Sequence, residues 1–239
     1  MKRVICSVVL WCLSVVHVDA TSGVIDIDDG QAYRQYQDIN KALQHMNVTY
    51  WMYYRSYLQD TRDGAEHACV YAIVLGKDGD SYKFEQGYER KMKNGSTEIV
   101  KMELYATPYK TDTITTPREV ANAMRVHKDK NSSGGAKYKL VYSDDKCRIL
   151  RLLDGDKLNN CELYIRDSFV DGEVPTFCAN MYGNACGRKS IHHSYQRMVY
   201  NQSCKKIINK PNEASTKMPT EETTGQEQET TQSSKPPGC

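Results

Sequence analysis

Two glutamates stand at positions where strand-like sequence is otherwise apolar. Glu98 has the same alternating phase as Val100 and Met102, and Glu162 follows a cysteine and precedes Leu163. A carboxylate buried without a partner is unstable in its charged form. Glu98 therefore reaches water from the strand end or, if buried, is neutral, salt-bridged or available to a cation, and the role of Glu162 depends on whether it faces a cavity or solvent. No basic residue stands at an obvious pairing position, which favours a bound cationic ligand.

Tyrosines accompany these acids. The chain has 17 Tyr and 3 Phe, and a tyrosine-rich run from residue 50 ends with Tyr57 and then Asp60. Tyrosine supplies an aromatic face and a hydroxyl, and aromatic faces beside carboxylates are what a cationic ligand requires. The alternative for Asp60 is a solvated turn residue at a strand end.

The sequence argues against several other function classes. His192 and His193 are adjacent and point to opposite faces of an extended segment, and no Gly-x-Ser-x-Gly, His-Glu-x-x-His or P-loop motif occurs. No cysteine pair has zinc-ribbon or redox spacing. A formal net charge of +2 without a basic run argues against nucleic acid. These patterns favour a binding protein with no cofactor or metal, not an enzyme.

The N-terminus is typical of a secretory signal peptide. A basic start precedes an apolar run from Val4 to Val16, which is shorter than the ~20 residues of a membrane span. We expect residues 1–20 to be removed and residues 21–209 to fold as one domain. Residues 210–239 are rich in Ser, Thr, Pro and Glu and are expected to form a disordered tail. The mature chain is then secreted and has no membrane span.

Secretion places the cysteines in an oxidising compartment. Without the signal peptide seven cysteines remain, so three disulfides are expected. Cys239 is left over, either free on a monomer or linking two chains. Asn-x-Ser/Thr sequons typical of a secreted glycoprotein occur at Asn47, Asn94, Asn131 and Asn201.

The elements that must position the candidate residues are mostly strands. Segments rich in Tyr, Val and Ile, separated by turn residues, predict strands at 48–58, 69–75, 81–88, 98–105, 111–116, 138–143, 147–153 and 161–166. Eight consecutive strands favour an all-β, antiparallel up-and-down barrel with room for one small ligand. A two-sheet sandwich is the alternative.

Two helices are expected beside these strands. Apolar residues from Ala32 to Met46 recur at helical spacing, and Asp28 or Asp29 can cap that helix. A second helix, lying on the barrel, is predicted within 173–186.

Over about residues 28–206 the sequence resembles the tick salivary lipocalins, specifically their histamine- or biogenic-amine-binding branch. The resemblance rests on the run 142–147 (Tyr-Ser-Asp-Asp-Lys-Cys), on Glu162-Leu163-Tyr164, and on Cys69, Cys178 and Cys204. It implies a protein secreted into saliva, with an eight-stranded lipocalin (calycin) barrel, an N-terminal helix and a C-terminal helix packed outside.

The same resemblance implies disulfides and a ligand site. The implied disulfides are Cys69–Cys204, Cys147–Cys178 and Cys161–Cys186. The implied amine site consists of Tyr57, Asp60, Glu98, Glu162 and Tyr164. In such a site the carboxylates pair with the ligand's ammonium or imidazolium, while the tyrosines pack against its ring.

Three positions depart from the family pattern. Arg148 stands where the amine motif has an acid, Asp63 replaces a tryptophan, and Tyr138 replaces an aspartate. In two-site relatives such residues form a second, weaker amine site. We therefore expect that second site to be lost, or reshaped for a neutral or anionic ligand.

The leading hypothesis is a scavenger that sequesters histamine or serotonin and thereby dampens host inflammation. One alternative is a lipocalin for a leukotriene or fatty acid, with Arg55 or Arg148 at the cavity mouth. Another is an inhibitor that binds a host protein and uses the barrel only as scaffold.

Overall fold

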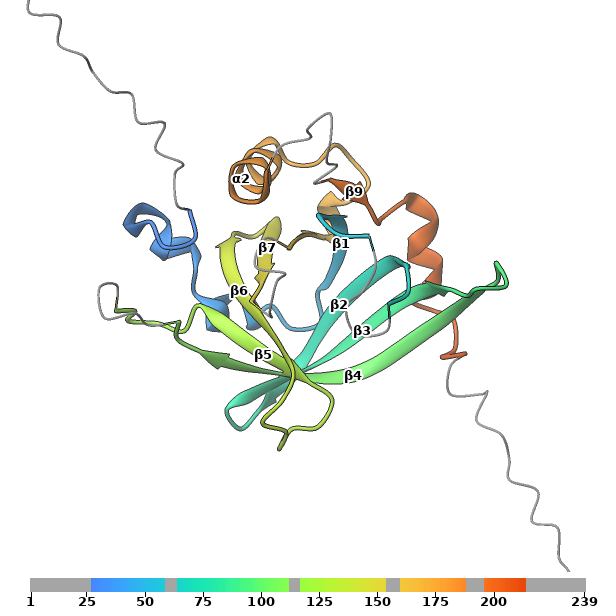
Figure 1. The fold of residues 1–239 in the computed structure, drawn as a ribbon, viewed down its shortest axis with the longest axis horizontal. Coiled ribbons are helices and arrows are strands. Elements are labelled where there is room, and N and C mark those ends of the chain that lie inside the picture. The colour runs from blue at the N-terminus through green and yellow to red at the C-terminus, as the bar shows by residue number, and fades with distance from the viewer. Residues whose placement is uncertain (1–26, 59–63, 112–116, 154–159, 188–195, 214–239) are drawn as a thin grey trace, which may run out of the picture.

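The computed structural model describes residues 27–58, 64–111, 117–153, 160–187 and 196–213 of the 239-residue chain. Its strands form an antiparallel barrel that closes because β1 pairs with both β8 and β2 (Figure 1). The closed all-β barrel confirms the predicted fold over the sandwich alternative. The barrel strands are β1 (Thr49–Arg55), β2 (His67–Asp78), β3 (Ser81–Lys91), β4 (Thr97–Tyr109), β5 (Ala123–His127), β6 (Ala136–Ser143), β7 (Cys147–Leu152) and β8 (Cys161–Arg166).

The fifth strand does not lie where the sequence predicted it. β5 is Ala123–His127 and pairs with β4 and β6. Of the predicted segment 111–116, Thr111 lies outside any strand and the remaining residues are not among those described. The Thr- and Ile-rich segment has the higher local β propensity, but pairing with neighbouring strands decides where a strand forms.

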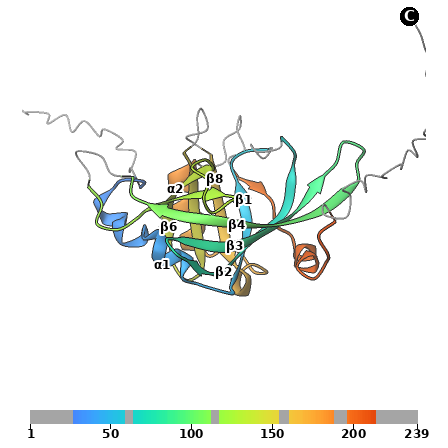
Figure 2. The same ribbon diagram turned by 90° about the horizontal axis from the view of Figure 1, so that it is seen from below.

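The long strand β4 extends past its neighbour β5. β4 pairs with β5 only over Tyr105–Tyr109, whereas on the other side of the β3–β4 ribbon β2 pairs with β3 as far as Arg90 (Figures 1 and 2). At the end of the described chain, Asn212 and Glu213 hydrogen-bond to the backbone of Lys101 and Ile99 in β4. The backbone edge that β4 presents there is thus partly satisfied by the C-terminal segment.

The N-terminal segment forms two short helices rather than the single helix that we predicted. These are η1 (Gln31–Tyr36) and α1 (Ile39–Leu43). Between them the fully buried Gln37 uses its side-chain amide to donate to the carbonyl of Val141 in β6 at 2.9 Å. This attachment to the barrel wall separates the two helices.

The predicted caps, Asp28 and Asp29, do not cap a helix. Asp38 caps α1, accepting a hydrogen bond from the Lys41 backbone N–H at 3.1 Å. Asp28 instead binds Arg151 of β7 at 2.6 Å. Asp29 binds Arg118 at 2.9 Å and Lys139 of β6 at 2.7 Å. Burial opposes the ionisation of Asp29, but hydrogen bonds from these two cations lower its pKa.

Two apolar cores lie on opposite faces of the barrel wall. The interior core includes inward residues of the strands together with Ile39, Ala42 and Leu43, by which α1 packs into the barrel. The outer core includes Trp51 of β1 and Tyr182 of α2 (Thr176–Cys186), which lies over the barrel in Figure 1. Helix α2 confirms the helix predicted within 173–186.

Each of the three disulfides joins a barrel strand to the outer layer, with the predicted pairing. Cys69 of β2 bonds to Cys204 of η4 (Gln202–Ile207). The other two bonds, Cys147–Cys178 and Cys161–Cys186, join β7 and β8 to α2. Each closed loop can contribute ~2–4 kcal/mol to stability. The outer layer also contains η3 (Asp167–Phe169) and β9 (Arg197–Met198), which pairs with β1.

The signal peptide and most of the tail lie outside the described residues, so both stay predictions. Within the described ranges, no helix is long and apolar enough to cross a membrane. The four sequon asparagines are exposed, as glycosylation requires: Asn47, Asn94, Asn131 and Asn201. That they carry glycans stays a prediction.

Gly87→Ala is expected to destabilise the fold by ~1–3 kcal/mol, the cost of overpacking. A Cβ at Gly87 would lie 2.3 Å from Cε1 of Tyr71, a buried ring whose hydroxyl donates to Glu85 at 2.6 Å. Gly76→Ala in β2 is the control, because nothing lies within 4 Å of its added Cβ. Urea unfolding measures both variants, and equal stability of the two would contradict this packing.

Candidate functional site

The interior of the barrel contains a cavity of about 70 Å³. This is on the order of five water-sized volumes. Most of its lining is apolar and comes from α1, β2, β3, β5, β6 and β7. Its polar lining residues are Tyr50, Gln86, Tyr138, Arg148, Glu162 and Tyr164.

A buried carboxylate bonded to a tyrosine lies at this cavity. Glu162 is 2% exposed, and its Oε1 accepts a hydrogen bond from the hydroxyl of Tyr57. In the sheet, Glu162 of β8 lies opposite Arg55 of β1, which places Tyr57 just past the end of β1. Tyr164, two residues along β8, points to the same side. The structure therefore brings together three of the predicted site residues, Tyr57, Glu162 and Tyr164.

The surroundings of Tyr57 keep its hydroxyl protonated. Burial, and then the negative charge of Glu162, raise the pKa of Tyr57 well above its ordinary value. The hydroxyls of Tyr138 and Tyr164 add to the shift. A protonated Tyr57 can continue to donate its hydrogen bond to the carboxylate.

A guanidinium lies at the α1 side of the same cavity. Arg148 is placed 3.7 Å from the ring centroid of Tyr50, and its Nη2 donates to the carbonyl of Ala42 in α1. The hydroxyl of Tyr50 lies 2.9 Å from Nδ1 of His45. Burial and then the charge of Arg148 lower the pKa of His45, which favours the neutral imidazole.

Glu98 has a basic partner that the sequence did not reveal. It is 3% exposed and faces inward, as its alternating phase predicted. Arg90 stands directly opposite on β3, and its Nη2 lies 3.3 Å from Oε2 of Glu98. Glu98 is not among the residues that line the cavity. Of the two predicted glutamates, only Glu162 lines the cavity.

Some predicted positions lie outside the described residues. Asp60 and Asp63 fall within 59–63, and His192 and His193 fall within 188–195. Their roles stay predictions.

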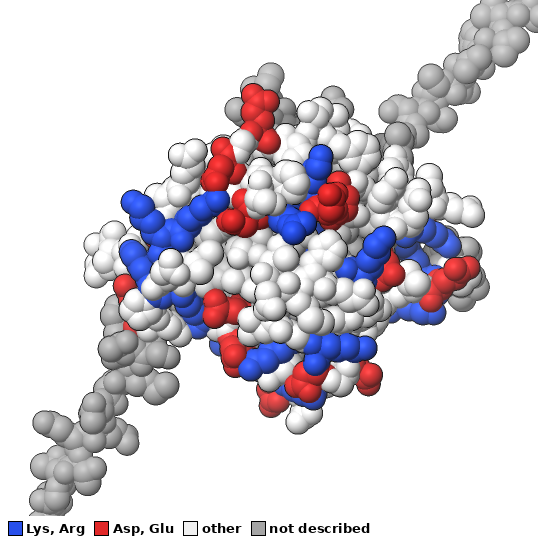
Figure 3. All heavy atoms as spheres, turned by 180° about the vertical axis from the view of Figure 1, so that it is seen from behind, with Lys and Arg blue, Asp and Glu red and all other residues white. Residues whose placement is uncertain are grey.

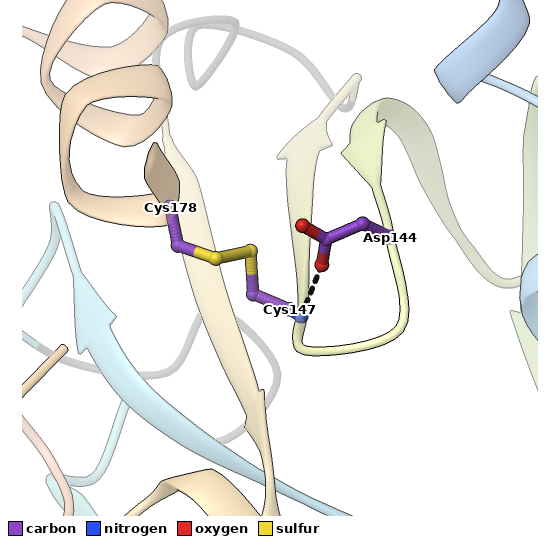
Figure 4. A group of neighbouring side chains, drawn as sticks. All are labelled: Asp144, Cys147 and Cys178. Carbon is purple, nitrogen blue, oxygen red and sulfur yellow. Dashed lines mark hydrogen bonds between the residues drawn. A yellow bond between two sulfur atoms is a disulfide. The ribbon is translucent and has the colours of Figure 1, made fainter. Parts of the chain in front are cut away.

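One group of side chains has the composition of a metal site but not its chemistry. Asp144, Cys147 and Cys178 lie close together (Figure 4). Both sulfurs are joined in a disulfide, and Asp144 accepts hydrogen bonds from the backbone N–H groups of Lys146 and Cys147 at 2.8 and 2.7 Å. The Asp144 carboxylate thus stabilises the tight turn between β6 and β7. Because both cysteines are in the disulfide, the cluster has no thiolate to bind a metal.

The outer surface offers less specific features than the cavity. On the face shown in Figure 3, basic and acidic side chains are interspersed rather than gathered in a patch of one sign. A larger groove of about 380 Å³ lies between the N-terminal segment and the β6–β7 turn. It is lined mainly by partly exposed polar residues such as Gln35, Asp38 and Asp145. The cavity is the better ligand site, because its charged groups are held in a mostly apolar, buried setting.

Sequence reasoning missed Tyr50, His45 and Gln86 and did not assign Arg148 an inward direction. A signal for Arg148 was present, because an outward disulfide at Cys147 requires the next residue of a strand to point inward. The positions of the other three depend on which strands meet across the barrel.

Comparison with known proteins gives a match to a family model. Residues 27–206 match the family model described as tick histamine binding protein. Among solved structures, Japanin from Rhipicephalus appendiculatus, bound to cholesterol, has 13% sequence identity and a TM-score of 0.45, over 66% of this chain and 96% of that chain. No curated protein sequence matches this chain.

The raised pKa of Tyr57 predicts a loss of stability in alkaline solution. The unfolded chain releases this proton near pH ~10, whereas the folded protein retains it, so stability falls as pH rises above that value. Tyr57→Phe should make the decline shallower by up to about 1.4 kcal/mol per pH unit.

Urea unfolding between pH 8 and 11 measures this slope, with Tyr36→Phe on an exposed ring as control. Identical slopes in the wild type and in Tyr57→Phe would contradict the assignment.

Proposed function

This chain belongs to the tick histamine-binding protein family, and we propose that it captures a small amine inside the barrel. It is a ligand-binding lipocalin, not an enzyme. In this proposal the protein is secreted into saliva and sequesters a host amine such as histamine or serotonin stoichiometrically, which dampens inflammation.

The observation that carries the proposal is the buried Glu162 carboxylate beside tyrosines. A carboxylate in a mostly apolar cavity binds an ammonium more strongly than one in water, because charge-assisted hydrogen bonds gain strength at low dielectric. Tyr57 donates to Oε1 and so fixes the orientation of the carboxylate. Tyr164 provides an aromatic face at the same cavity, which suits the ring or the cation of an amine.

The size of the cavity supports an amine over a lipid. A volume of about 70 Å³ has room only for a small ligand. A leukotriene or a fatty acid needs a much longer apolar space, since drug-sized ligands occupy pockets of ≈300–1,000 Å³. No feature of the described residues specifically favours the host-protein inhibitor.

The remaining candidate residues take different roles in this proposal. Asp60 is proposed as a second carboxylate, on the strength of the family resemblance alone. Glu98 is proposed to act mainly through its ion pair with Arg90, since it does not line the cavity.

Glu162→Gln should abolish tight amine binding while keeping the volume of the side chain. Truncating one partner of a buried charge pair costs about 2–5 kcal/mol, which is a loss of at least ~30-fold in affinity. Calorimetric titration of histamine at pH 7.4 measures it. Glu98→Gln is the matched control, because it makes the same change at another buried glutamate. It should lower the stability of the protein more than its affinity for histamine.

Retained affinity in Glu162→Gln with loss in Glu98→Gln would move the site to the Arg90 end of the β3–β4 ribbon. Binding of leukotriene C4 without binding of any amine would support the lipid alternative instead.

Amine affinity should also fall in acid. The ammonium stays charged at low pH, but a carboxylate loses its charge as pH falls toward the ordinary Glu value of ~4.3. Titrations at pH 7.4, 6, 5 and 4, each with a check that the protein remains folded, measure the effect. An affinity that stays constant down to pH 4 would show that an ionised carboxylate is not the counter-ion.

A further inference from the structure

Arg148 occupies an inward position that strand alternation normally gives to an apolar residue. In β7 the outward Cys147 and Ile149 belong to the outer core, and the inward Leu150 and Leu152 belong to the interior core. Arg148 shares the inward phase and lines the cavity. A charged group on this face requires a physical reason, since desolvating a guanidinium is costly.

The contacts of Arg148 do not neutralise its charge. Among the described residues, no carboxylate lies within ion-pair distance of Arg148. Its Nη2 donates to the carbonyl of Ala42, and its guanidinium carbon lies over the Tyr50 ring, so both contacts are with uncharged groups. The cavity wall therefore carries a positive charge that a ligand acceptor can meet.

Arg148 and Glu162 line the same cavity from neighbouring strands. In the register of β7 and β8, Arg148 lies opposite Tyr164, and Glu162 lies opposite Leu150. The two charged residues are thus diagonal neighbours on the inner face, with a backbone separation of ~7–8 Å. The guanidinium reaches toward α1 and forms no ion pair with Glu162. This arrangement suits a ligand that has a cation at one end and an acceptor at the other.

We infer that Arg148 is a specificity residue that selects monoamines with a hydrogen-bond acceptor at the end remote from the ammonium. Suitable acceptors are a phenolic oxygen or the unprotonated nitrogen of an azole ring. A second cation is excluded, because it would meet the guanidinium at low dielectric. The inference rests on the proposed amine function and adds which amines the site accepts.

A purely structural role for Arg148 makes a different prediction. Through Ala42, Arg148 also anchors α1 to the barrel. If anchoring were its only role, replacing it would change stability and would weaken all amines alike. Relative affinities therefore separate the two roles, whereas the absolute affinity of one ligand does not.

The test uses three ligands of similar length, titrated calorimetrically into the secreted protein. Tyramine has an ammonium and a phenolic oxygen, phenethylamine lacks the oxygen, and 1,5-diaminopentane has a second ammonium. The wild type should bind tyramine at least ~10-fold more tightly than phenethylamine, the value of a hydrogen bond to a charged group. It should bind the diamine more weakly than phenethylamine.

In Arg148→Met, which keeps an unbranched side chain, tyramine and phenethylamine should bind equally and the diamine should gain affinity at least ~10-fold relative to them. Arg148→Lys should retain the exclusion of the diamine, because the charge remains. Thermal unfolding checks that each variant is folded. If Arg148→Met does not fold, the ligand ratios of Arg148→Lys are compared with those of the wild type.

Three outcomes would overturn the inference. Equal binding of tyramine and phenethylamine by the wild type would show that no acceptor is recognised. Unchanged ligand ratios in folded Arg148→Met would assign Arg148 to anchoring alone. Failure of the wild type to bind any of the three amines would overturn this inference, and failure to bind histamine as well would overturn the proposed function, whereas phenethylamine binding that depends on Glu162 would leave the proposed function standing.

Discussion

The geometry of the site depends on two disulfides that lie outside it. Cys147 of β7 and Cys161 of β8 both reach outward to α2. Successive residues of a strand point to opposite faces, so the residue after each cysteine, Arg148 or Glu162, must point inward. Neither charged side chain can turn to solvent without breaking the register between β7 and β8. The covalent attachment of the outer helix therefore also fixes the two charges inside the barrel.

Closure of the barrel brings the inward-pointing side chains together around one cavity. Because β1 pairs with both β2 and β8, inward side chains from all parts of the wall share one small space. Helix α1 fills part of that space with Ile39 and Leu43, which leaves a cavity suited to a small ligand. A rigid, nearly filled interior also means that a ligand meets charges that are already oriented, which reduces the entropic cost of binding.

Local patterns in the sequence predict what depends on local geometry. Alternation placed Glu98 inward, and turn residues separated seven of the eight strands at nearly the observed bounds. The disulfides and the grouping of Tyr57 with Glu162 came from the family resemblance. The errors concern interactions between distant segments. β5 forms through pairing with β4 and β6, the N-terminal helix is interrupted by the contact of Gln37 with β6, and the partner of Glu98 depends on the β3–β4 register. These three features depend on which distant segments meet in the fold, and the local sequence does not specify those contacts.

A crystal structure of the histamine complex tests the central claim most directly. The account predicts histamine inside the barrel, with its ammonium within hydrogen-bonding distance of Glu162 and its ring between Tyr164 and Arg148. Histamine bound only in the groove between the N-terminal segment and the β6–β7 turn, with the interior cavity unchanged, would contradict it.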